Sequence, residues 1–181
     1  MMLQIFVLAA ALASTQAPAP PEFTPSVNPV LDAARKSLVE HSKYLIDAAE
    51  LMPAEKYGYH PTDAQMTFSK LVAHITTTNT VICSMIGSLP VSPDVMKLDD
   101  MAPKETLVTA MKQSFAVCTE ALAKTTDAQL GEELTLMARR SGQSRAAAVI
   151  TITSDWADHY STAASYLRLN GILPPSAQPK K

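Results

Sequence analysis

Charged and aromatic side chains are scarce in this chain of 181 residues: Asp, Glu, Lys and Arg make up 18% of it, and Phe, Trp and Tyr make up 6%. Fifteen basic residues stand against 17 acidic ones, and the net charge is −2. Proteins that bind nucleic acids gather Lys and Arg into patches that meet the phosphates. The sequence has no basic tract of that kind, so it predicts no nucleic-acid partner.

Long apolar runs are also missing, except at the N-terminus. Residues 1–21 carry no charged side chain, and the stretch 3–13 is apolar apart from Gln4. Small residues follow it, and Ala13, at the end of the A-x-A match Ala11-Leu12-Ala13, and Ala17 are candidate cleavage positions. This pattern is typical of a secretory signal peptide, so we expect residues 1–17 to be removed and the protein to be exported, to the periplasm or outside the cell. Because no Lys or Arg precedes the apolar stretch, the alternative is an apolar N-terminus of a cytosolic protein.

After removal of the signal peptide we expect no membrane association, because no other apolar run is long enough to cross a bilayer. Only two cysteines are present, Cys83 and Cys118, and they do not form a C-x-x-C pair. In an oxidising compartment they could form one disulfide bond. The alternative is two reduced thiols packed in a core. The sequence leaves both alternatives open.

Proline and glycine are unevenly placed. None of the 13 prolines falls in 30–52, 62–89 or 104–173, and Gly131 and Gly142 divide the last of these gaps. Because proline breaks helix interiors, the gaps are where long helices are expected. Mostly apolar residues recur in them at spacings of three and four, which predicts helical faces that pack together. These residues are Leu31, Ala34, Leu38, His41, Leu45, Ala48 and Met52, then Phe68, Leu71, Ile75, Thr78, Ile82 and Met85, then Leu107, Met111, Ser114, Cys118 and Leu122.

The fourth helix is expected from Arg145 to Asn170, with Asp155 or Trp156 on its inner face, and the third from Lys104 to Lys124. The second helix is expected to begin near Thr62. No pair of strands is expected, and 132–140 is interpreted as a short strand or an irregular segment. The fold class is therefore all-α, a four-helix bundle. The bundle spans 30–175, after a Pro-rich flexible spacer at 18–29 and before a disordered tail at 176–181.

Asp155 and His159 are the first candidate residues for a functional site. They stand four apart on one helical face, and a carboxylate and an imidazole one turn apart can hold a divalent cation. His74 of the second helix would complete a site of two histidines and one carboxylate, with positions left open for water or substrate. The alternatives are a simple ion pair on a helix face and a hydrogen-bonded core histidine.

Two parts of the chain resemble the DinB/YfiT-like superfamily, and specifically its exported, uncharacterised bacterial members. The resemblance covers about 30–175. It is carried by Ala48-Ala49-Glu50-Leu51-Met52-Pro53-Ala54-Glu55-Lys56-Tyr57, Pro61-Thr62, Phe68, Ala73-His74-Ile75, Asp158-His159-Tyr160 and Tyr166-Leu167-Arg168-Leu169-Asn170-Gly171-Ile172-Leu173-Pro174-Pro175.

The resemblance implies up-down-down-up connectivity and a metal site made by one histidine of helix two and an H-x-x-x-H pair of helix four. His74 and His159 match two of these positions. Asp155 stands where the family has the first histidine of the pair, so the site is either altered in metal preference or lost. Zinc, nickel, manganese or iron are the metals that such a set would hold. The resemblance also implies a homodimer.

Two functions follow as hypotheses. One is a metal-dependent hydrolase or transferase that acts on an unknown small molecule. The other is a non-catalytic bundle that binds a ligand or a partner and whose metal site is degenerate. His41 is interpreted as a core histidine with a hydrogen-bond partner, His60 as a loop residue, and Trp156 and Tyr160 as packing residues.

Overall fold

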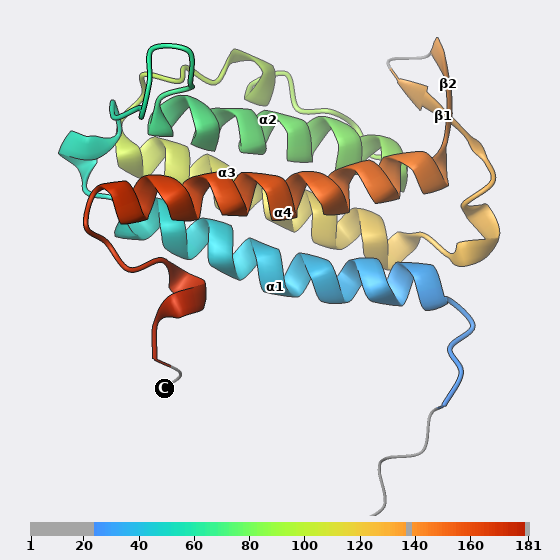
Figure 1. Cartoon of the computed structure of the whole chain (residues 1–181). Helices are drawn as coiled ribbons and strands as arrows, with labels where there is room; N and C mark the ends of the chain where they lie inside the picture. The colour runs from blue at the N-terminus through green and yellow to red at the C-terminus, as the bar shows by residue number, and fades with distance from the viewer. Residues whose placement is uncertain (1–23, 137–138, 180–181) are drawn as a thin grey trace, which may run out of the picture.

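The computed structural model describes residues 24–136 and 139–179, and it is a bundle of four long helices (Figure 1). This confirms the all-α fold class. The signal peptide, residues 18–23 of the spacer and the last two residues of the tail lie outside the described residues. The helices are α1 (Pro29–Leu51), α2 (Phe68–Gly87), α3 (Lys104–Lys124) and α4 (Arg145–Leu169). Short 3₁₀ turns are η1 (Ala54–Lys56), η2 (Val95–Lys97), η3 (Asp127–Gln129) and η4 (Pro175–Ala177).

Helices α1 and α4 run in one direction and α2 and α3 run in the other (Figure 1). Hydrogen bonds at both ends of the bundle follow from this order. The carboxylate of Asp127, just after α3, accepts from the backbone N–H groups of Val30 and Leu31 at the start of α1, at 2.9 Å each. At the other end, Lys104 Nζ donates to the carbonyl oxygens of Glu50 and Met52. Because α2 and α3 are parallel, residues 88–103 must return along the whole bundle.

The second helix begins later than the sequence suggested, at Phe68 rather than near Thr62. The side chain of Thr67 caps it by accepting from the N–H of Lys70 at 3.2 Å. The carbonyl of Tyr59 accepts from the N–H of Phe68, so the preceding loop satisfies the first helical donors. Residues 62–65 form a turn instead.

The buried face of α2 also differs from the expected one in its second half. Ile82 and Met85 are only half-buried, whereas Asn79, Cys83 and Ile86 are almost fully buried. Helix α2 packs against both α3 and α4. A helix with two neighbours buries a broader face than a single stripe, and the apolar spacing alone could not show which edge of that face lay deepest.

A strand pair joins α3 to α4, contrary to the expectation of none. Strands β1 (Glu133–Leu136) and β2 (Arg139–Ser144) pair antiparallel with an irregularity between Glu133 and Thr135. Leu134 is buried in the core, which anchors the hairpin. Ser144 ends β2 and caps α4 by accepting from the N–H of Ala147 at 3.3 Å. Within the described residues, no helix combines the length and the apolar character needed to cross a membrane.

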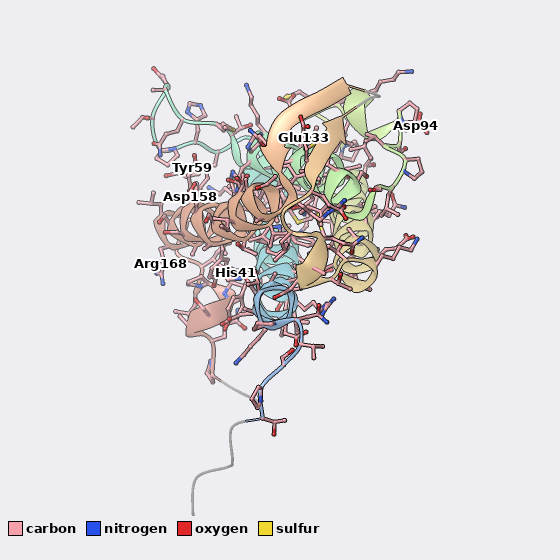
Figure 2. All side chains as sticks on the ribbon, turned by 90° about the vertical axis from the view of Figure 1, so that its right-hand side faces the viewer. His41, Tyr59, Asp94, Glu133, Asp158 and Arg168 are labelled. Carbon is pink, nitrogen blue, oxygen red and sulfur yellow. A yellow bond between two sulfur atoms is a disulfide. The ribbon has the colours of Figure 1, made fainter. Side chains whose placement is uncertain are left out.

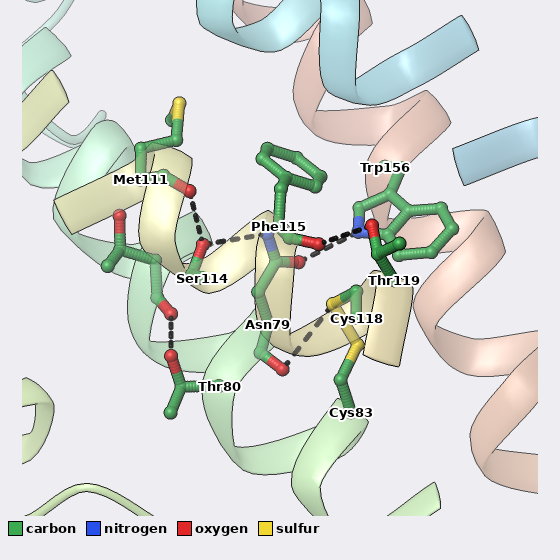
Figure 3. The surroundings of a disulfide bond; sticks show 10 residues. Asn79, Thr80, Cys83, Met111, Ser114, Phe115, Cys118, Thr119 and Trp156 are labelled. Atoms are coloured by element: carbon green, nitrogen blue, oxygen red, sulfur yellow. Dashed lines mark hydrogen bonds between the residues drawn. A yellow bond between two sulfur atoms is a disulfide. The ribbon is translucent and has the colours of Figure 1, made fainter. Parts of the chain in front are cut away.

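Cys83 of α2 and Cys118 of α3 form a disulfide bond, with their Cα atoms 4.9 Å apart (Figure 3). Both residues are fully buried. This settles the question that the sequence left open about the two thiols. One turn further along α2, a Cβ atom on Gly87 would lie 2.7 Å from the Cα of Ala121. The absence of a side chain at Gly87 is therefore what lets α2 and α3 approach so closely.

Candidate metal centre

His74 of α2 and His159 of α4 lie in contact across the two antiparallel helices. Their ring centroids are 5.0 Å apart and the rings meet edge to face at 63°. His159 is half-buried and His74 is exposed. The structure thus brings together two of the three side chains that the sequence singled out, from positions 85 residues apart in the chain.

The pKa of His74 is lowered below its ordinary value. Partial burial is the main cause, and the neighbouring imidazole of His159 adds to it, while the carboxylate of Asp155 acts in the opposite direction. Two imidazoles in contact cannot both carry a proton without repulsion. His74 is therefore neutral at neutral pH, which is the form that binds metal ions.

Asp155 is half-buried on α4, one turn before His159, and it is close enough to His74 to act on its charge. The inner position that the sequence left open between Asp155 and Trp156 belongs to Trp156, which is 1% exposed. Among residues 24–136 and 139–179, no group of three or more His, Cys, Asp or Glu side chains has the arrangement of a metal site. Imidazole and carboxylate are donor types that suit a divalent metal, but Asp155 does not complete a three-residue ligand group with His74 and His159.

A buried polar network holds α2, α3 and α4 together (Figure 3). Trp156 Nε1 donates to Asn79 Oδ1 at 2.7 Å, and Asn79 Nδ2 donates to Ser114 Oγ at 3.2 Å. All three residues are 1% exposed. Because these bonds fix α4 against α2, they also set the distance between His74 and His159.

Sequence reasoning missed Asn79. The residue stands four positions after Ile75 and four before Cys83, which places it on the buried side of the helix. A polar residue at such a position needs a partner, and Trp156, with an indole N–H that also needs one, was the available donor. A search for a donor to pair with the buried Asn79 could therefore have found the network from the sequence.

The other two histidines lie outside the site. His41 Nδ1 donates to the carbonyl oxygen of Ser37 at 2.9 Å, which confirms the expected hydrogen-bond partner, but the residue is half-buried rather than part of the core. His60 lies in the loop before α2, with Nδ1 2.8 Å from the carbonyl oxygen of Thr62. Figure 2 shows His41 on α1, apart from the part of α4 that carries Asp158.

The sequence matches no protein-family model and no curated protein. Solved structures do match. A DinB-like protein from Bacillus subtilis superposes with a TM-score of 0.64 at 21% identity, over 81% of this chain and 99% of that one. A DinB-like protein from Bacillus cereus gives a TM-score of 0.64 at 16% identity, over 80% and 95%. A mycothiol-dependent maleylpyruvate isomerase gives 0.58 at 14% identity, over 72% of this chain and 59% of the isomerase.

Proposed function

We propose that this chain, which has the fold of DinB-like proteins, binds a divalent metal ion. The ligands would be His74 and His159, with Asp155 as the third. The contact between the two imidazoles carries the proposal, because it joins metal-binding side chains from two helices. Imidazole and carboxylate together suit zinc, nickel, manganese or iron. Such a metal acts as a Lewis acid and lowers the pKa of a water or thiol that binds to it.

The residues of the chain itself have separate roles in this proposal. His74 offers a neutral ring nitrogen, because partial burial of its otherwise exposed ring and the neighbouring His159 lower its pKa. Asp155 supplies a negative charge that offsets that of the cation. Asn79 and Trp156 join α2 to α4, the two helices that carry the three ligands. A metal-dependent hydrolase or transferase acting on a small molecule is the enzyme class that fits these parts.

Metal content tests the proposal. Protein without a His-tag would be stripped, reconstituted with zinc, nickel or manganese, and analysed for bound metal and for affinity by calorimetry. We expect one metal per chain, with affinity at least about tenfold weaker in His74→Ala, His159→Ala and Asp155→Ala, because each removes one donor. His60→Ala is the matched control and should bind as the wild type does. Protein that takes up none of the three metals would contradict the proposal.

The incomplete donor set among the described residues favours a second function, a non-catalytic bundle that binds a ligand or partner. In that case the two histidines are remnants of a degenerate metal site. The same experiment separates the two functions, since the second predicts no stoichiometric metal in the wild type.

We also propose that the protein is exported. The buried disulfide supports this, because such bonds persist in oxidising compartments and are rare in the cytosol. The N-terminal residue of the protein recovered from its source cells tests it. A mature chain that starts after Ala13 or Ala17 is expected, and an intact Met1 in the cytosolic fraction would contradict it.

A further inference from the structure

A groove of about 880 Å³ lies between the outer face of α1 and the segment that follows α4. We call it the tail groove. Its apolar lining comes from both sides, and Val39 is 72% exposed. Figure 1 shows η4 and the residues after it descending past α1. The apolar lining residues are Val39, Tyr44, Leu51, Pro175 and Pro179.

Ring stacking and a hydrogen bond hold the two walls of the tail groove in place. The rings of Tyr44 on α1 and Tyr160 on α4 stack with centroids 4.9 Å apart and planes within 20°. The hydroxyl oxygen of Tyr160 accepts from the N–H of Ser176 at 2.8 Å. The segment after α4 is thereby tied to α4, and α4 to α1. The groove is thus a preformed feature of the fold.

Acidic side chains outnumber basic ones in the lining. Lys43 pairs with Asp47, and Glu50 pairs with Lys112 of α3 at 2.5 Å. Glu40, beside the exposed Val39, has no ion-pair partner among the residues that the structure describes. Within the described part of the chain, one carboxylate of the groove therefore lacks a compensating charge, and it lies next to an apolar surface.

We propose that the tail groove binds an organic amine: a ligand with one ammonium group and an apolar or aromatic body. The volume falls in the range of small-molecule sites. Glu40 would receive the ammonium group, and the apolar lining would receive the body. The ring of Tyr44 adds attraction for a cation. The groove lies along α1, whereas the contact of His74 and His159 lies between α2 and α4, so this site is independent of the proposed metal centre.

Three ligands with the same indole ring test the charge preference: tryptamine is a cation, tryptophol is neutral and indole-3-acetate is an anion. Each would be titrated into the whole ¹⁵N-labelled protein and followed by NMR. We expect tryptamine to bind most tightly, with shifts confined to residues 39–51 and 175–179. Equal binding of indole-3-acetate, or shifts located elsewhere, would overturn the proposal, as would no shift with tryptamine at millimolar concentration.

Glu40→Gln should weaken tryptamine binding about fivefold, the effect of one partly exposed charge pair, and should leave tryptophol binding unchanged. Glu105→Gln removes an exposed carboxylate of α3 that is outside the lining, and it is the matched control. Because Glu40 is exposed and forms no ion pair with any residue in 24–136 or 139–179, its variant should fold normally. Unchanged tryptamine affinity in Glu40→Gln would refute the role of Glu40.

Discussion

Removal of the disulfide bond between α2 and α3 is expected to lower the stability of the bundle by a readily measured amount. The double variant Cys83→Ala/Cys118→Ala is preferable to treatment with a reductant. Both cysteines are 0% exposed, so a reductant can reach the sulfur atoms only when the bundle opens. Alanine in both positions removes the crosslink and leaves no thiol to react.

The magnitude follows from the length of chain that the bond closes. Cys83 and Cys118 are 35 residues apart. Closing a loop of that length removes about 4 kcal/mol of chain entropy from the unfolded state. For a domain of this size, that loss lowers the thermal midpoint by about 12 °C.

Thermal unfolding followed by circular dichroism at 222 nm is the assay. Reductant added to the double variant should change nothing, which controls for effects of the reductant itself. A midpoint within about 3 °C of the wild type would refute the reasoning, because it would show that the crosslink does not restrict the unfolded chain. Two freely alkylated thiols in the oxidised wild type would refute the bond itself.

Two further predictions concern packing around the same helices. Gly87→Ala should lower the free energy of unfolding by about 1–3 kcal/mol, since the new Cβ meets the backbone of Ala121. Gly131→Ala is the control and should change the free energy little, because its Cβ would meet nothing within 4 Å. Similar denaturant midpoints for the two variants would contradict the close approach of α2 and α3. Asn79→Ala should cost about 1–3 kcal/mol, because it leaves the indole N–H of Trp156 buried without a partner. Urea unfolding measures this cost, and a loss below about 0.5 kcal/mol would show that the N–H finds another acceptor.

The helices were predictable from the sequence because proline and glycine mark their ends. Helix α3 has the bounds expected from Pro103 and Lys124, and α4 differs by one residue at its end. The start of α2 was misplaced because Thr62 and Thr67 are both acceptable helix caps. The hydrogen bond from Phe68 to Tyr59 selects the second, and that contact depends on the folded loop.

The candidate site was only partly predictable. Spacing placed Asp155 and His159 on one face of a helix, His74 was the histidine of the second helix that could complete the set, and the family resemblance matched His74 and His159 to metal-binding positions. The pairing of His74 with His159 depends on how α4 is rotated against α2. The buried bond between Asn79 and Trp156 sets that rotation, and it joins residues 77 positions apart. The same hydrogen bond places Trp156, rather than Asp155, in the core. Helical spacing alone could not decide between these two neighbouring residues.

The disulfide bond has a topological consequence for the return segment between α2 and α3. Residues 83–118 form a closed covalent ring, and the whole of 88–103 lies inside it. A single protease cut within 88–103 would leave both halves of the protein joined. Each half would keep two helices, and the cleaved molecule would keep its mass, apart from one added water, until it was reduced. The ring therefore protects the covalent integrity of the bundle at the one connection that must span its full length.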